Sequence, residues 1–146
     1  MTSQEHEPLQ RIPKHLWIFG GLNLLWHAWL LYDLIMLLAR NEEYLATSPS
    51  ELLALFYDGP RWLQVLWAVA VFNGVLGSAM LVMRKANAVR NLVVFFGASL
   101  ACSIYNFSAI LDFAGPVGPM LSALELLVAL GFVFYASDLK ERGVLR

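Results

Sequence analysis

Trp62–Met83 reads WLQVLWAVAVFNGVLGSAMLVM, a run without a charged side chain that lies between Arg61 and the pair Arg84-Lys85. Three further stretches contain no Lys or Arg, namely Leu16–Ala39, Leu92–Leu111 and Met120–Ser137. Each stretch reaches the roughly 17–25 residues that a helix needs to cross about 30 Å of hydrocarbon. The sequence therefore predicts four membrane-spanning helices.

The overall composition supports this prediction. Hydrophobic residues make up 59% of the chain and charged residues 14%, whereas soluble domains average about 45–50% and about 25%. A soluble all-α protein would interrupt its apolar stretches with polar residues at helical spacing, and these stretches are apolar nearly all round. The net charge of −1 and the absence of a clustered basic face argue against nucleic-acid binding.

We expect one membrane domain over residues 1–146, an all-α four-helix bundle with spans at about 16–39, 62–83, 91–112 and 119–137. Short connections make consecutive helices antiparallel neighbours, which gives an up-down-up-down order. The sequence Gly-Pro-Val-Gly-Pro at 115–119 predicts a tight hairpin between the last two spans. The first apolar run exceeds the 7–15 residues of a signal-peptide core, so we expect it to remain as a span.

The basic residues are distributed unevenly between the two sides of the predicted bundle. Arg40 and Arg61 lie on one side, and eight lie on the other: Arg11, Lys14, Arg84, Lys85, Arg90, Lys140, Arg142 and Arg146. Because basic residues concentrate on the cytoplasmic side of membrane proteins, this bias predicts that both termini are cytoplasmic.

The segment between Arg40 and Arg61 is then on the outer side. Its Ser48-Pro49-Ser50-Glu51 sequence has the form of a capping box with Pro at the first helical position, which predicts a short helix at about 49–57. This helix could lie on the outer leaflet as an interfacial helix or pack on the bundle, and the residues leave both alternatives open.

Polar residues within the spans are the candidate functional residues, because ionisable groups in a bilayer usually face the bundle interior. At about 1.5 Å of rise per residue, one tier lies roughly 9–11 Å below the outer boundary and a second at about 17–18 Å. The first tier contains Asp33, Asn106 and Glu125, and the second contains His27, Asn73 and Cys102.

Asp33 and Glu125 are the candidates for handling a proton or a cation, because two carboxyls at similar depth could share either one. The alternative is that each is protonated or paired with Arg40, Arg61 or Gln64 near the surface.

His27 could relay protons, ligate haem, or be a neutral imidazole bonded to Asn23 or Asn73. Haem ligation lacks a second axial candidate, since His6 and His15 are not placed to supply one. The expected lining of a solute path is formed by Asn23, Trp26, Asn73, Ser103 and Asn106. Interhelical hydrogen bonding is the alternative for the polar members of this set, and lipid contact or packing is the alternative for Trp26.

The order of several features resembles a known family. Asn23, Trp26 and Tyr32-Asp33 in the first span are followed by Asn41–Leu45, Trp67 and Gly74–Ser78 before a basic turn. This order, over about residues 15–110, resembles a family of small bacterial four-span inner-membrane proteins that are often labelled sugar transporters. The resemblance implies solute transport and a place in the bacterial inner membrane.

The first functional hypothesis is a proton- or cation-coupled transporter or exporter subunit for a small solute. It would act as a homodimer, because four helices enclose little room for a cavity and its gates. The alternative is a non-catalytic scaffold or accessory subunit of a larger complex, and a haem- or quinone-binding redox protein is a third hypothesis. No metal-ligand spacing or nucleotide-binding motif occurs, so we expect neither enzymatic activity nor a cofactor, and the lipid bilayer is the expected partner.

Overall fold

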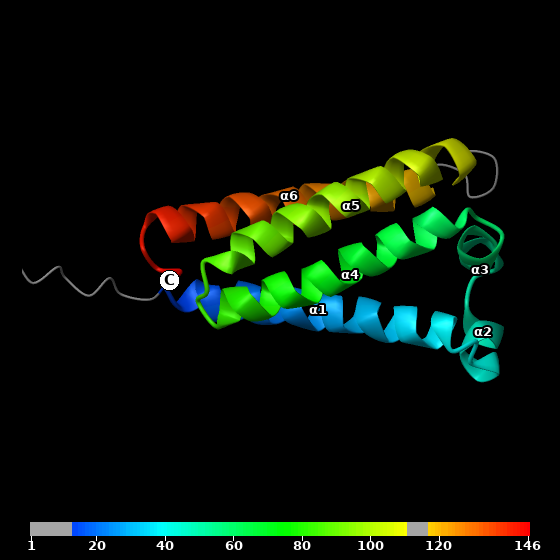
Figure 1. Cartoon of the computed structure of the whole chain (residues 1–146), viewed down its shortest axis with the longest axis horizontal. Coiled ribbons are helices and arrows are strands. Elements are labelled where there is room, and N and C mark those ends of the chain that lie inside the picture. Colours follow the sequence, from blue (N-terminus) through cyan, green and yellow to red (C-terminus); the bar gives the residue numbers. More distant parts are fainter. Residues whose placement is uncertain (1–12, 111–116) are drawn as a thin grey trace, which may run out of the picture.

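The computed structural model describes residues 13–110 and 117–146, which form six helices and no strand. Four helices are long: α1 (Lys14–Leu38), α4 (Arg61–Val82), α5 (Asn87–Ile110) and α6 (Val117–Glu141) (Figure 1). Each of the four is long and apolar enough to cross a membrane. The prediction of an all-α membrane bundle with four spans is confirmed. The last residues of the predicted third span, 111–112, lie outside the described part of the chain. Residues 115–116 of the predicted hairpin lie outside the described part of the chain.

The four long helices pack in chain order. α1 packs on α4, α4 on α5, and α5 on α6. α1 and α6 meet near the start of α1, where His15 Nδ1 lies 2.6 Å from the Tyr135 hydroxyl and Phe19 packs edge-on against the Tyr135 ring. Beyond this contact, residues 19–27 of α1 and residues 121–132 of α6 border a cavity, described below. The bundle is therefore less tightly closed between α1 and α6 than between its other neighbours.

One end of the bundle, which we call the basic end, contains Lys14, the Arg84-Lys85 turn and Arg142 (Figure 1). The C-terminal residues fold back onto this end: the Arg146 amide donates to the Arg84 carbonyl at 2.7 Å, and the Ala86 amide donates to the Arg146 carbonyl at 3.0 Å. These bonds close a buried cluster to which all four long helices contribute. Its members are Leu16, Leu81, Ala88, Leu92, Ala136, Leu139, Val144 and Leu145.

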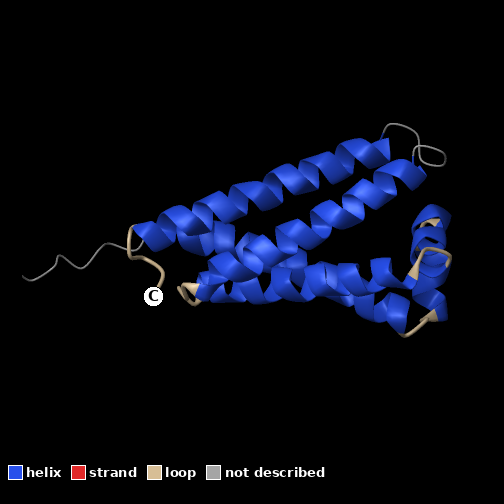
Figure 2. Ribbon diagram, turned by 45° about the horizontal axis from the view of Figure 1, so that its top comes forward, coloured by secondary structure: helices blue, strands red, loops and turns tan. Residues whose placement is uncertain are grey.

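The opposite end, which we call the α3 end, is crossed by two short helices, α2 (Glu42–Thr47) and α3 (Ser50–Tyr57) (Figures 1 and 2). Phe56 of α3 is buried and packs edge-on against Trp67 of α4. The Tyr57 hydroxyl donates to the Leu37 carbonyl at 2.6 Å, and the Gln64 amide donates to the Phe56 carbonyl. The predicted short helix thus exists, with its apolar face packed on the bundle.

The predicted capping box at Ser48 is wrong. The N-cap of α3 is Pro49, which makes no side-chain capping bond. Instead, the Ser48 hydroxyl donates to the Tyr44 carbonyl at 2.9 Å. The reason is that residues 42–47 form a helix of their own, capped by the Asn41 side chain, and Ser48 satisfies a carbonyl at the end of that helix.

The exterior of the four long helices carries large exposed apolar side chains. On α1 these include Trp17, Ile18, Leu25, Trp29 and Ile35, and on α6 they include Met120, Leu127 and Phe134. Water-soluble monomeric proteins rarely expose so large an apolar surface. It matches the hydrocarbon core of a bilayer, so lipid contact accounts for it.

Candidate functional site: two cavities that share Glu125

The contact between α1 and α4 is centred on His27 and Gly74. His27 is 2% exposed, and a Cβ atom added to Gly74 would lie 2.0 Å from His27 Cδ2. Only glycine therefore lets the imidazole lie against the α4 backbone. Phe95 of α5 covers the ring from another side, in an edge-on contact with the ring centroids 4.5 Å apart.

Hydrogen bonds connect the Nδ1 side of His27 to Asn23 and Ser78. His27 Nδ1 lies 2.8 Å from the Asn23 carbonyl oxygen, which can only accept, so Nδ1 carries the proton. The Asn23 side-chain amide donates to the Ser78 hydroxyl at 2.8 Å, and that hydroxyl donates to the Gly74 carbonyl at 2.7 Å. Asn23, His27 and Ser78 thus form a closed hydrogen-bonded group that joins α1 to α4.

The second nitrogen of His27 is buried and unpartnered. Nε2 has less than 1 Å² of accessible surface and no hydrogen-bond partner among the described residues. An added Gly74 Cβ would lie 2.6 Å from it, so Nε2 is close to the α4 backbone. Haem iron must bond directly to the imidazole nitrogen, and this nitrogen is covered. The geometry disfavours the haem hypothesis for His27.

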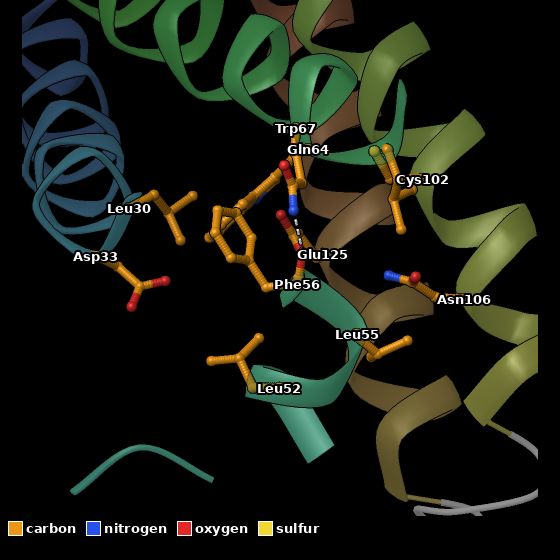
Figure 3. Close-up of a pocket in the computed structure, with 11 residues that line it drawn as sticks. Leu30, Asp33, Leu52, Leu55, Phe56, Gln64, Trp67, Cys102, Asn106 and Glu125 are labelled. Carbon is orange, nitrogen blue, oxygen red and sulfur yellow. Dashed lines mark hydrogen bonds between the residues drawn. The ribbon is translucent and has the colours of Figure 1, made fainter. Parts of the chain in front are cut away.

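A cavity of about 250 Å³ lies between the spans and α3, and we call it the α3 cavity (Figure 3). Its polar lining comes from Asp33, Gln64, Cys102, Asn106 and Glu125. Figure 3 shows the Asn106 amide turned into this cavity. Asn106 Oδ1 is buried and has no hydrogen-bond partner among the described residues. An unpartnered buried acceptor is costly unless a bound molecule satisfies it, which makes the α3 cavity a candidate binding site.

A second cavity of about 620 Å³ lies between α1 and α6, and we call it the lateral cavity. Apolar and aromatic side chains form most of its wall, including Phe19, Leu22 and Trp26 of α1 and Leu124 and Phe132 of α6. Its polar lining is limited to four residues: Asn23, His27, Ser122 and Glu125. This cavity therefore combines an apolar wall with a small polar patch, as small-molecule sites commonly do.

Glu125 of α6 lines both cavities. Within residues 13–110 and 117–146, no hydrogen bond or ion pair reaches its carboxyl. Arg40 instead lies over the Tyr57 ring, with its guanidinium carbon 5.1 Å from the ring centroid. The Gln64 side-chain amide donates to the Phe56 backbone carbonyl. The carboxyl of Glu125 is thus an unpaired group at the boundary between the two cavities.

Asp33 also lines the α3 cavity, but from the opposite side. Figure 3 places its carboxylate on α1, across the cavity from Glu125. The Tyr44 hydroxyl of α2 donates to Asp33 Oδ1. This hydrogen bond, with a smaller contribution from burial, raises the pKa of Tyr44 to about 12. The two carboxyls therefore have different surroundings, one partnered and one free.

The remaining candidates from the sequence divide between the cavities and the helix contacts. Trp26 and Asn23 line the lateral cavity, and Asn106 lines the α3 cavity. Asn73 donates back to the Val69 carbonyl of its own helix at 2.8 Å, and it lines neither cavity. Ser103 is half-buried and also lines neither. His27 is bonded to Asn23, as one of its predicted alternatives stated, and to no atom of Asn73.

Three hydrogen-bonded contacts near the candidate site were absent from the sequence-based prediction. Ser78 joins the Asn23–His27 group, Tyr44 holds Asp33, and Gln64 holds α3. Ser78 lies four residues after Gly74, which places the two on one helix face, so spacing could have suggested it. No spacing rule connects Tyr44 to Asp33, because the turn between α1 and α2 decides their approach.

Comparison with known proteins adds no assignment: no protein-family model, no curated protein and no solved structure matches this chain.

Proposed function

We propose that this small polytopic membrane protein is a proton- or cation-coupled transporter of a small solute. The observation that carries the proposal is the position of Glu125, whose unpaired carboxyl lines two cavities at once. A carboxyl that binds a proton or a cation at this boundary changes the electrostatics of both cavities together. Coupled transport requires that the bound ion alter the affinity for the solute, and a group shared by two cavities can do so.

The polar lining of the α3 cavity supports solute binding there. The Asn106 side chain offers a buried acceptor without a partner, and Trp67 and Phe56 supply flat apolar surfaces. Polar groups near aromatic faces are a common arrangement for small polar ligands. The resemblance to the four-span family often labelled sugar transporters implies the same class of activity.

The placement of the protein in its membrane is part of the proposal. Seven basic residues of the described chain lie at or near the basic end, against Arg40 and Arg61 at the α3 end, and this bias supports a cytoplasmic basic end in a bacterial inner membrane. The α3 cavity would then open toward the outer side. The limited room inside four helices supports a homodimer as the transporting unit.

The test uses purified protein reconstituted in liposomes that contain a pH-sensitive dye. A proton gradient is imposed, and a panel of small sugars, amines and carboxylates is added one at a time. A coupled transporter gives a solute-dependent change of internal pH that empty liposomes do not give. The expected result is such a change for at least one solute and its loss in Glu125→Gln.

The matched control is Glu141→Gln, since Glu141 is an exposed carboxyl on the same helix and lines neither cavity. This variant should transport as the wild type does. Absence of any solute-dependent or gradient-dependent flux in the wild type, or equal flux in Glu125→Gln, would contradict the proposal.

A scaffold or accessory subunit is the second candidate, and the closed Asn23–His27–Ser78 group favours it. The Asn23 amide, the Ser78 hydroxyl and His27 Nδ1 are hydrogen-bonded within the chain, and interhelical hydrogen bonds of this kind fix helix packing. On this hypothesis Ser78→Ala lowers the thermal stability in detergent by about 1 kcal/mol. Glu125→Gln would then raise stability, because it removes an unpaired carboxyl from an apolar region.

A further inference from the structure

We propose that the lateral cavity is a binding site for a hydrophobic organic cation, held by the Glu125 carboxylate. This inference rests on the proposed transport function and names the substrate class of the same carboxyl. The reasons are the charge of the lining, the chemistry of the wall and the place where the cavity lies in the bundle.

The charge of the lining selects a cation. Glu125 is the one acidic side chain among the residues that line the lateral cavity, and that lining contains no Lys or Arg. The Asn23 amide donates to Ser78 and His27 Nδ1 bonds to the Asn23 carbonyl, while Ser122 carries no charge. An unpaired carboxylate in a low-dielectric site attracts a positive charge far more strongly than it does in water. An anionic ligand would meet repulsion there.

The wall of the cavity selects a hydrophobic ligand. Phe19 and Trp26 come from α1, Phe95 from α5 and Phe132 from α6. Aromatic rings pack against apolar groups, and their faces also attract cations. The attraction for cations grows when water is excluded. The volume of about 620 Å³ lies within the ~300–1,000 Å³ that is usual for small-molecule sites. A bulky aromatic or alkyl ammonium or phosphonium matches both properties.

The position between α1 and α6 gives such a ligand a route. The ring contacts and the hydrogen bond that join these two helices lie near His15 and Tyr135, at the basic end. Outside the cavity, both helices expose large apolar side chains, for example Leu25 on α1 and Leu127 on α6. A hydrophobic cation dissolved in the bilayer can therefore reach Glu125 sideways, without crossing a polar barrier.

Binding is measured with tetraphenylphosphonium, by equilibrium dialysis against the full chain in detergent, in mildly alkaline buffer. Tetraphenylborate is the matched probe, because it has the same shape and the opposite charge. Empty micelles provide the blank for both. We expect saturable binding of the phosphonium and none of the borate above the blank. Equal binding of the two would overturn the inference, because it would show partitioning without charge recognition.

Glu125→Gln tests the carboxylate. We expect the dissociation constant for tetraphenylphosphonium to rise about tenfold or more, which corresponds to about 1.4 kcal/mol. Glu125→Asp keeps the charge, so it should still prefer the phosphonium to the borate, and Glu141→Gln should bind as the wild type does. Unchanged affinity in Glu125→Gln would overturn the inference.

Tryptophan emission locates the ligand, since Trp26 lines the lateral cavity and Trp67 lines the α3 cavity. The phosphonium-induced change in emission should be lost in Trp26→Phe and retained in Trp67→Phe. The reverse result would place the ligand in the α3 cavity and overturn the inference. Because these measurements need no gradient, they separate the two proposals. Binding without flux supports this site and contradicts transport, whereas flux of other solutes without phosphonium binding contradicts this site alone.

Discussion

At the scale of single residues, the polar groups in the spans fall into two kinds. Asn23, Ser78 and the Nδ1 atom of His27 are joined by hydrogen bonds that connect two helices. The Glu125 carboxyl and Asn106 Oδ1 face cavities without a partner. The first kind stabilises the contact between helices, and the second is available to a bound ligand. Substitutions of the first kind should therefore change thermal stability, and substitutions of the second kind should change ligand binding.

Gly74→Ala tests the packing role. The new Cβ would lie 2.0 Å from His27 Cδ2, so either the imidazole or the α1–α4 contact must move. We expect a loss of about 1–3 kcal/mol in stability, as for other overpacked cores, measured by thermal unfolding in detergent. Gly97→Ala is the control, because nothing lies within 4 Å of its added Cβ; it should leave stability unchanged or raise it by up to about 1 kcal/mol. Equal losses in both variants would contradict the described contact.

At the scale of elements, the two short helices at the α3 end are held to the spans by different contacts. α2 is held by the hydrogen bond from Tyr44 to Asp33. α3 is held by the burial of Phe56 and by the bonds of Tyr57 and Gln64. The attachment of α2 is therefore sensitive to pH, and that of α3 depends mainly on apolar packing.

Tyr44 should titrate unusually late. Its folded pKa is about 12 against a usual 10.0, so the neutral hydroxyl is favoured in the folded protein. The stabilisation by its bond to Asp33 is fully present below about pH 10 and is lost as the pH rises through about 12. The difference between the tyrosinate absorbance curves of wild type and Tyr44→Phe should be a single-tyrosine step near pH 12. A step near pH 10 would show that the hydroxyl does not bond Asp33.

Phe56→Ala should release α3 from the bundle. Truncating a buried phenylalanine typically costs about 3–5 kcal/mol, and here most of that loss falls on the docking of α3. We expect faster tryptic cleavage after Arg61 and Arg40, measured in detergent at a fixed protease concentration. Ala54→Ser changes an exposed residue of the same helix, and its cleavage rate should match the wild type. Slow cleavage in Phe56→Ala would mean that α3 docks without this side chain.

At the scale of the whole molecule, the two ends of the bundle differ in how they are closed. The basic end has a buried cluster to which all four long helices and the C-terminal residues contribute. The α3 end has a cavity that Leu52, Leu55 and Phe56 of α3 help to line. The α3 end also has a buried cluster, formed by Leu34, Leu37, Phe56 and Val71. Apolar packing thus supports both ends, whereas the candidate binding surfaces extend toward the α3 end.

Leu145→Ala tests the contribution of the basic end. Leu145 is 4% exposed within the cluster, and truncation of a buried leucine typically costs about 2–5 kcal/mol. We expect a lower unfolding temperature for the whole bundle. Arg142→Ala removes an exposed ion pair with Asp138, which should change stability by less than about 1 kcal/mol. If the two variants unfold at the same temperature, the C-terminal residues do not support the bundle.

The sequence by itself determined the four spans and their order, because hydropathy adds up over consecutive residues and each span satisfies its own backbone hydrogen bonds. It also singled out Asp33, Asn106 and Glu125, which line one cavity in the structure. Only the tertiary structure decided that Asp33 is held by Tyr44 whereas Glu125 is unpaired. Whether each carboxyl has a partner depends on how the helices are rotated, on the spacing of α1 from α6 and on the path of residues 39–60. These features depend on contacts between residues far apart in the chain, which a local sequence pattern does not contain.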